Sequence, residues 1–414
     1  MHDRDLYATI LGITLPWKVS NVELDAKLEV VSVTVEPANA SALACPECGA
    51  SCPGYDTRHR RWRHLDTCQY QTLLIMDVPR VECPQHGVRQ VKIPWGEEGS
   101  RFTALFEAVV IDWLKEAPTK AVARRLALTW DEVDGIMQRA VARGLTRRKP
   151  RDLYAIGVDE TSFQKRHEYV TVVTDLLTSD VLHVADHRRT ASLDEFYRAQ
   201  TKERLADLEI VAMDMSKAYI SSTRKHVPDA DKKIAFDRFH VAKVIGDALD
   251  KVRREEHRAL LAVGDRTLTG TKHLLLRRGD ALDVHQEGVV DLLRSIGLKT
   301  ARAWAIKEAA TKLWSYVKKG WAAKAWKKWI SWAMRSRIEP IKKAARTIRD
   351  HLWGIVNAVT LGVTNATSES INSKIQKIKK VACGFRNRDR FRTAILFHLG
   401  GLDLYPASVT HTDS

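Results

Sequence analysis

The feature that most constrains the fold of this 414-residue chain is a duplicated pattern of metal-ligating side chains near its start. Residues 45–49 read Cys-Pro-Glu-Cys-Gly, and residues 83–87 read Cys-Pro-Gln-His-Gly. Two residues between ligands let both side chains of a tight turn reach one ion, and two such turns supply the four tetrahedral ligands of a structural Zn²⁺. We therefore predict one zinc ion held by Cys45, Cys48, Cys83 and His86.

The segment between these turns is expected to complete a small metal-dependent domain. Residues 70–76 read as a β-strand, which predicts a zinc ribbon over residues 41–98, preceded by an N-terminal arm over residues 1–40. A ribbon this small depends on its metal for folding. Cys52 and Cys68 remain alternatives for one of the four ligands, because their spacing does not exclude them.

Bulk composition narrows the class of protein. A chain of this length can form two or three domains, each with its own core. No apolar run approaches the roughly 20 residues of a transmembrane helix, and residues 1–5 lack the layout of a signal peptide. We therefore expect a cytoplasmic protein whose six cysteines bind metal or remain free thiols rather than forming disulfides.

The charge of the chain indicates a polyanionic partner. The formal net charge is +16 and the pI is about 9.6. Such an excess of positive charge favours nucleic acid as the partner, although a basic enzyme with another substrate would share it. Residues 58–64 gather arginine and histidine around Trp62. This cluster suits phosphate contact, and a solvated loop is the alternative.

A helical segment follows the predicted ribbon. Apolar residues recur with helical spacing over residues 102–114, and a second short helix is expected from Pro118 to about residue 128. Thr129 and Glu132 form a capping-box pattern that starts a third helix, which we expect to end near Gly144. This order predicts a helix-turn-helix over residues 101–149, whose last helix would enter the major groove. An ordinary three-helix bundle is the alternative.

From Tyr154 the pattern becomes rich in strands. Strands are predicted at residues 155–158, 169–175 and 181–185, then a helix at 192–202, and further strands at 208–213 and 234–236. This order matches the ribonuclease-H fold, a mixed sheet with flanking helices. We therefore predict an α/β catalytic domain in two parts, residues 153–240 and 361–400.

Three acidic residues stand where such a sheet would gather metal ligands. Asp159 ends the first predicted strand, Asp214 ends the fourth, and Glu369 opens a helix over residues 369–380. Carboxylates at strand ends and at a helix start can converge on hard divalent cations, because Mg²⁺ requires oxygen ligands. At about 100° per residue, Glu369 shares a stripe of this helix with Asn372, while Ile371 and Ile375 lie opposite.

The two parts of the predicted catalytic domain are separated by a helical and basic insertion over residues 241–360, and a tail follows over residues 401–414. Four tryptophans are expected to form the core stripe of one inserted helix, with base stacking as the alternative. They are Trp321, Trp326, Trp329 and Trp332. The lysines between them would lie on the opposite, solvated or DNA-facing side.

Together, these motifs resemble bacterial insertion-sequence transposases of the ISL-three family. The resemblance rests on the two ligand turns, the helix-turn-helix and four catalytic-domain motifs in order, and it covers nearly the whole chain. The four motifs are Gly157-Val158-Asp159-Glu160, Asp214-Met215-Ser216, Phe236-Asp237-Arg238-Phe239-His240 and Glu369-Ser370-Ile371-Asn372. It implies a DDE transposase that binds the terminal inverted repeats of its element, cuts at the ends and joins them to target DNA.

By motif position, the resemblance implies that Asp159, Asp214 and Glu369 hold two Mg²⁺ or Mn²⁺ ions. Asp237, His240 and Asn372 are candidates to support this site without binding the ions; a strand cap and a packed histidine are the alternatives for the first two. The basic residues expected to bind DNA are Arg124, Arg125, Arg139, Arg143, Arg147, Arg148, Lys374, Lys377 and Lys380. We expect a homodimer on DNA, associated with the bacterial nucleoid.

Two other functions remain compatible with these motifs. A nuclease or resolvase of the ribonuclease-H fold would cut DNA but never join strands. A transposase-derived regulator would bind DNA without cutting it, and the intact acidic triad argues against that reading.

Overall fold

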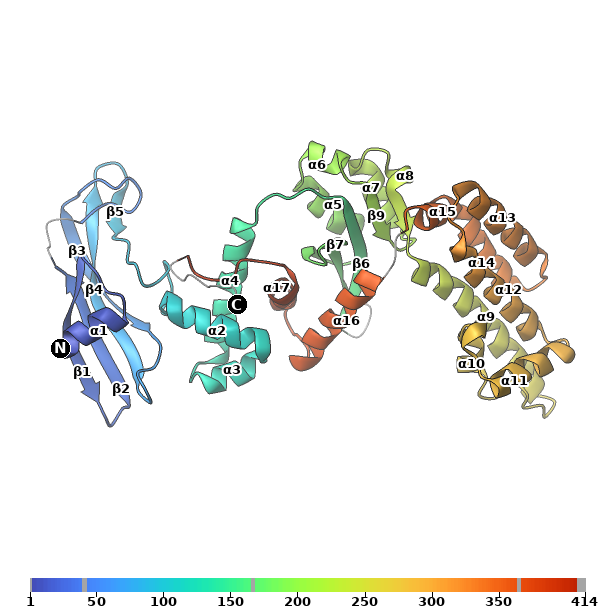
Figure 1. Cartoon of the computed structure of the whole chain (residues 1–414), viewed down its shortest axis with the longest axis horizontal. Coiled ribbons are helices and arrows are strands. Elements are labelled where there is room, and N and C mark those ends of the chain that lie inside the picture. Colours follow the sequence, from blue (N-terminus) through green and yellow to red (C-terminus); the bar gives the residue numbers. More distant parts are fainter. Residues whose placement is uncertain (1, 39–42, 165–167, 363–365, 408–414) are drawn as a thin grey trace. The chain divides into compact units, whose positions relative to one another are not determined.

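The computed structural model describes residues 2–38, 43–164, 168–362 and 366–407, and these form two compact units (Figure 1). Unit 1 comprises residues 1–148 and 402–414, and unit 2 comprises residues 149–401. Within the described part of the chain, no helix is long and apolar enough to cross a membrane.

The first half of unit 1 is a five-stranded sheet with the order β1-β2-β4-β3, in which β5 also pairs with β4. Its elements are α1 (Asp3–Ile10), β1 (Trp17–Asp25), β2 (Val30–Pro37), β3 (Gly54–Arg63), β4 (Gln71–Cys83) and β5 (Gly87–Gln90). The strand predicted at residues 70–76 is present as β4, but it continues into the second ligand turn.

The prediction of an N-terminal arm over residues 1–40 was wrong. Strand β2 pairs in parallel with β4 and antiparallel with β1, so this segment belongs to the sheet. Val31, Val33 and Val35 are buried on alternate positions of β2. This is the period of two expected for a strand with one buried face.

The second half of unit 1 is the predicted three-helix segment. It contains α2 (Ala104–Glu116), α3 (Thr119–Arg125) and α4 (Trp130–Arg147). The capping box at the start of α4 is present, because Thr129 accepts a hydrogen bond from the backbone of Glu132 and the Glu132 side chain accepts one from the backbone of Thr129. Helix α4 extends three residues beyond the predicted end at Gly144.

Residues 402–407, the described part of the predicted tail, pack against these helices. The backbone oxygen of Leu404 accepts a hydrogen bond from Arg143 on α4. The Tyr405 hydroxyl accepts one from Lys115 on α2 at 2.6 Å. Residues 402–407 therefore fasten α2 to α4 within unit 1.

Unit 2 is built on a mixed sheet with the order β10-β9-β6-β7-β8. Its strands are β6 (Ala155–Gln164), β7 (Glu168–Asp175), β8 (Val181–Asp186), β9 (Ile210–Met213) and β10 (Ile234–Phe236). The first three pair antiparallel, whereas β9 pairs in parallel with both β6 and β10. All five predicted strands are present, and β6 runs six residues beyond its predicted end at Val158.

Short helices connect the strands of this sheet. They are α5 (Thr190–Arg198), α6 (Lys202–Ala206), α7 (Lys217–His226) and α8 (Ala230–Lys233). The single helix predicted at residues 192–202 is wrong in extent. Thr201 caps a new helix, α6, by accepting a hydrogen bond from the backbone of Arg204, so the chain breaks between α5 and α6.

After β10 the chain leaves the sheet for a helical insertion, seen in Figure 1 as the olive to orange helices. Its main helices are α9 (Arg238–Leu261), α10 (Lys272–Leu276), α11 (Val284–Ser295), α12 (Lys299–Lys312), α13 (Lys319–Arg335), α14 (Glu339–Asp350) and α15 (Leu352–Thr360). The sheet and the insertion share one continuous apolar core. The chain then returns with α16 (Ala366–Val381), which packs on β6, and α17 (Arg388–Leu399), which packs on β8.

The predicted tryptophan stripe on α13 is half right. Trp326 is fully buried and Trp329 is 4% exposed, but Trp321 and Trp332 are exposed. The Trp329 indole N–H donates to the backbone oxygen of Ile306 on α12, which fixes it in the core. The intervening lysines lie on the exposed side of α13.

We expect Trp326→Ala to lower the free energy of unfolding by about 3–5 kcal/mol, the usual cost of removing a buried tryptophan. Trp321→Ala is the matched control on the same helix and should change it by less than about 0.5 kcal/mol. Denaturant unfolding of the two variants measures both effects. Equal losses would show that α13 is not packed through Trp326.

Candidate active site and metal centre

The two ligand turns of unit 1 bring their side chains together. The ligand atoms of Cys45, Cys48, Cys83 and His86 all lie within 4.8 Å of one another. The Sγ atoms of Cys48 and Cys83 are 3.7 Å apart, and His86 Nδ1 is 3.5 Å from Cys83 Sγ. Tetrahedral Zn²⁺ with Zn–S near 2.3 Å and Zn–N near 2.0 Å would set these separations at about 3.8 and 3.5 Å. The cluster therefore fits one zinc ion.

The alternative cysteine ligands lie outside this cluster. Cys52 is buried and its Sγ contacts the backbone oxygen of Ala50 at 3.4 Å, while Cys68 is exposed. Hydrogen bonds from the backbone of Gln85 and His86 lower the pKa of the Cys83 thiol to about 7. The thiolate is the form that binds metal, so the local backbone favours the ligand state of Cys83.

We expect Cys83→Ser to lose the zinc ion and to unfold the ribbon sheet, because a domain held by a structural metal is unstable without it. Cys68→Ser, which changes an exposed thiol outside the cluster, is the control and should keep one equivalent of zinc. Metal analysis and thermal unfolding report the two effects. A Cys83→Ser protein that retained its zinc would overturn the ligand assignment.

In unit 2, three aspartates stand directly after the last paired residues of three neighbouring parallel strands. In the register of the sheet, Val158 of β6 and Phe236 of β10 both face Met213 of β9. Asp159, Asp214 and Asp237 come directly after Val158, Met213 and Phe236 in the sequence. Because parallel strands run in the same direction, the three carboxylates lie at one edge of the sheet.

This register corrects one detail of the prediction for Asp159. Strand β6 does not end there, because its antiparallel pairing with β7 continues to Gln164. Its parallel pairing with β9 does end at Val158. Asp159 therefore lies where the parallel pairing of β6 with β9 ends, although β6 itself continues.

Helix α16 brings the third predicted acid to the same edge. Asn372 donates to Asp159 Oδ2 at 2.7 Å, and Gln376 donates to Thr161 Oγ1 at 2.9 Å. Ile371 and Ile375 are buried beneath the helix. Glu369 lies in its first turn, is exposed, and its charge raises the pKa of Asp237.

A glycine in β6 permits this close approach of α16. A Cβ atom on Gly157 would stand 3.1 Å from the hydroxyl oxygen of Ser368 and 2.9 Å from a methyl carbon of Leu176. Ser368 is the neighbour of Glu369 in α16. A side chain at residue 157 would push the helix away from the strand and carry Glu369 with it.

The gathered carboxylates disfavour one another's ionisation. Burial raises the pKa of Asp159, and the charge of Asp214 raises it further. Burial also raises the pKa of Asp237 to about 6, and the charges of Asp159 and Glu369 add to this. Buried like charges need a cation to stay ionised, and an all-oxygen donor set suits a hard divalent one.

An arginine supplies positive charge to this cluster. Arg188 follows β8; its Nε lies 2.8 Å from Glu160 Oε2, and its Nη2 pairs with Asp214. Burial raises the pKa of Glu160 and the Arg188 charge opposes that rise. Neither Arg188 nor a role for Glu160 was predicted from the sequence. The only local signal was that Glu160 adjoins Asp159.

The carboxylates are less tightly gathered than the zinc ligands. Among the residues that the structure describes, the Cys/His cluster is the one group of three or more such side chains with all its ligand atoms within 4.8 Å. His240 lies 3.7 Å from Asp237 Oδ2, and Asp237 also caps α9 by accepting from the backbone of Phe239 at 2.8 Å. Asp237 thus caps a helix and also contributes charge to the acidic cluster.

Two arginines predicted to bind DNA are held inside unit 1. Arg139 donates to Glu107 at 2.6 Å, and Arg143 bridges Glu107 at 2.9 Å and Glu97. The Arg143 side chain is 7% exposed and that of Glu107 is 1% exposed. These contacts tie α4 to α2 and pair both guanidinium groups within unit 1, so DNA binding by Arg139 and Arg143 stays a prediction.

The other predicted DNA contacts differ in their accessibility. Arg147 pairs with Asp403 at 3.1 Å, and Arg148 is half-buried. The remaining predicted DNA-binding residues are exposed: Arg124, Arg125, Lys374, Lys377 and Lys380.

We expect Arg188→Ala to lower the free energy of unfolding by about 1–2 kcal/mol without divalent ions, because it strips the cation from a charged hydrogen-bonded group, discounted for the 41% exposure of Arg188. Mg²⁺ should then stabilise the variant more than the wild type, since a bound cation replaces the lost charge. Thermal unfolding with and without Mg²⁺ measures both. Arg189→Ala, an exposed neighbour, is the control, and an identical response of the two variants would contradict this role.

Comparison with known proteins agrees with this architecture. Residues 156–395 match the DDE transposase model of the ISL3 family, residues 91–141 match the helix-turn-helix domain of transposase family ISL3, and residues 42–86 match the zinc finger of the IS204/IS1001/IS1096/IS1165 transposases. The transposase for insertion sequence element IS1557 of Mycobacterium tuberculosis is 28% identical, over 97% of this chain and 96% of that protein. The transposase for IS1001 of Bordetella parapertussis is 27% identical, over 87% and 89%. The chain belongs to the ISL3 family of insertion-sequence transposases.

Proposed function

We propose that this transposase binds the terminal inverted repeats of its own element and performs divalent-metal-dependent cleavage and strand transfer at Asp159, Asp214 and Glu369. The observation that carries the proposal is the register of β6, β9 and β10, which sets three aspartates at one sheet edge. The strand order and directions also support a ribonuclease-H-like fold for this sheet.

The acidic residues would hold two Mg²⁺ or Mn²⁺ ions. Asp159 and Asp214 come from the rigid sheet, and Glu369 comes from the first turn of α16. Asn372 fixes the orientation of Asp159 through the hydrogen bond to Oδ2. When bound, a pair of divalent ions supplies an activated nucleophile and stabilises the leaving oxygen of an in-line displacement.

Other residues of unit 2 would act on the DNA backbone. Lys374, Lys377 and Lys380 are exposed on α16, the helix that carries Glu369. Their ammonium groups can hold phosphates on either side of the reacting one. Arg188 would exchange its carboxylate partners for a phosphate oxygen once the carboxylates hold metal, because a guanidinium binds both groups with the same geometry.

Unit 1 would recognise the ends of the element. Strand β3 is an edge strand, and residues 58–61 on it are largely exposed and basic. Trp62 is buried in the ribbon core, so it is not available for a DNA base. Arg124 and Arg125 are exposed at the end of α3. These groups suit phosphate contacts that position DNA, and a homodimer would bring two such ends together.

We expect Asp159→Asn, Asp214→Asn and Glu369→Gln each to reduce cleavage and joining at least about 100-fold, because each removes one charge from a metal-binding group while keeping its shape. Binding to terminal-repeat DNA should change less than about twofold. Cleavage and strand-transfer assays with labelled element ends in Mg²⁺ measure the effects. Glu195→Gln on α5, an exposed acid outside the cluster, is the control.

The same assay separates the rival functions. Cleavage without joined products would favour a nuclease or resolvase, and end binding without any cleavage would favour a DNA-binding regulator. If Glu369→Gln cleaved at nearly the wild-type rate, the third ligand would have to be sought elsewhere, and Asp237 is the next candidate because it lies at the same sheet edge.

A further inference from the structure

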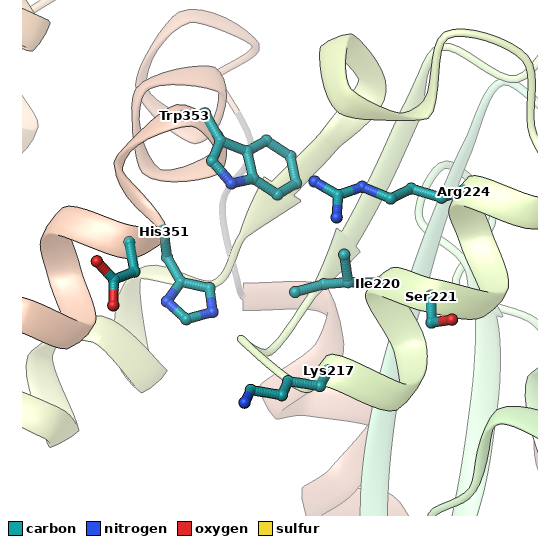
Figure 2. Close-up of a pocket in the computed structure, with 7 residues that line it drawn as sticks. Lys217, Ile220, Ser221, Arg224, His351 and Trp353 are labelled. Atoms are coloured by element: carbon teal, nitrogen blue, oxygen red, sulfur yellow. The ribbon is translucent and has the colours of Figure 1, made fainter.

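Unit 2 contains a cavity of about 330 Å³ whose lining no step of the proposed reaction uses. It lies between α7 and the junction of α14 with α15 (Figure 2). The lining residues are Lys217, Ile220, Ser221, Arg224, Asp350, His351 and Trp353.

The cavity adjoins the edge of the sheet that carries the acidic residues. Helix α7 begins at Lys217, three residues after Asp214. Phe236, the last residue of β10, immediately precedes Asp237 and packs edge-on against two lining residues. Its ring centroid lies 5.4 Å from that of His351 and 5.0 Å from that of Trp353. The cavity and the aspartates are therefore built on the same two elements, α7 with the end of β9 and the end of β10.

The lining combines two cationic side chains and one carboxylate, that of Asp350, with two aromatic rings. Figure 2 shows Lys217, Arg224, His351 and Trp353 arranged around Ile220. The guanidinium carbon of Arg224 lies 5.2 Å from the Trp353 ring centroid, and its Nε donates to Asp231 at 2.7 Å, which restrains the side chain. His351 Nδ1 lies 2.8 Å from the backbone oxygen of Thr347, which fixes that ring as well. Arg224 and His351 are thus held in place beside Trp353 and Lys217.

We propose that this cavity receives one nucleotide displaced from the DNA duplex beside the reacting phosphodiester. Its base would stack on Trp353, and its phosphate would lie against Lys217 and Arg224. The inference rests on the proposed function, because it needs DNA at the neighbouring acidic cluster.

The size and chemistry of the cavity favour a nucleotide over other ligands. Its volume is at the lower end for small-ligand sites and is too small for duplex DNA. Aromatic side chains bind displaced or single-stranded bases by stacking, and cationic side chains follow the backbone. Ile220 is the one aliphatic lining residue, and the other apolar lining surface comes from the aromatic rings.

The test uses the full chain and duplex oligonucleotides that end either flush or with three unpaired nucleotides, one of them fluorescent 2-aminopurine. Stacking on an indole ring quenches 2-aminopurine. We expect the wild type to quench the unpaired probe several-fold, and Trp353→Ala to abolish the quenching. Lys217→Gln and Arg224→Gln should weaken binding of the unpaired substrate about tenfold and that of the flush duplex less than twofold.

Two controls separate this site from general effects. Lys324→Gln and Lys327→Gln, on the exposed side of α13, remove the same charge and should leave the preference for unpaired ends unchanged. Trp353→Phe keeps an aromatic ring against Phe236 and should retain part of the quenching if Trp353→Ala proves unstable. Equal losses on both substrates, or quenching that survives in folded Trp353→Ala, would overturn the nucleotide site.

Cleavage of element ends in Mg²⁺, measured on the same preparations, tests the proposed function separately. Active cleavage without quenching would overturn only the nucleotide site. Quenching that depends on Trp353, with no cleavage by the wild type, would overturn the proposed reaction and leave the site standing.

Discussion

The repulsion among carboxylates at one edge of a sheet is the constraint on which the rest of unit 2 depends. The parallel pairing of β9 with β6 and with β10 ends at one level of the sheet, and this register holds Asp159, Asp214 and Asp237 at the same edge. Each is partly or largely removed from water, where unbalanced charge is most unfavourable. The raised pKa values of Asp159 and Asp237 express this repulsion. Carboxylates whose ionisation is disfavoured by burial and by one another are suited to bind divalent cations, because a cation balances their negative charge.

The chain meets this constraint with positive and polar groups from other elements. Arg188 reaches the cluster from the end of β8, His240 from the first turn of α9, and Asn372 from α16. These residues lie far apart in sequence, and the common core of sheet and insertion fixes them relative to one another. The insertion is therefore part of the support of the site, because Asp237 is the N-cap of α9 and α15 packs on β10.

Sequence patterns correctly predicted the features that depend on interactions between residues close together in the chain. The capping box at Thr129, the strand before Asp214 and the two zinc turns each depend on residues close together in sequence, and all three are present. The attachment of the β1–β2 pair to the ribbon sheet was missed because β4, which pairs with β2, lies more than 30 residues away. The pattern of apolar residues within one segment does not show whether that segment pairs with a distant strand.

Charge and aromatic residues were harder to place for a different reason. The charge of a side chain does not show whether it already forms an ion pair within the protein. Arg143, for example, belongs to a buried ion-pair network with Glu97 and Glu107. On α13, the helical angle should have separated the tryptophans. At about 100° per residue, Trp321 and Trp332 lie about 20° apart and more than 110° from Trp326. One face therefore buries Trp326 and leaves the other two in solvent.

The junction between insertion and sheet shows how tightly these parts are coupled. A Cβ atom on Gly354 of α15 would stand 2.5 Å from the Phe236 ring, so only glycine lets α15 lie this close to β10. Phe236 in turn contacts His351 and Trp353 and precedes Asp237. A movement of α15 would thus displace the Phe236 ring, and with it the neighbouring Asp237 at the edge of the sheet that carries the aspartates. The same contact that closes the core also holds His351 and Trp353, two residues that line the cavity.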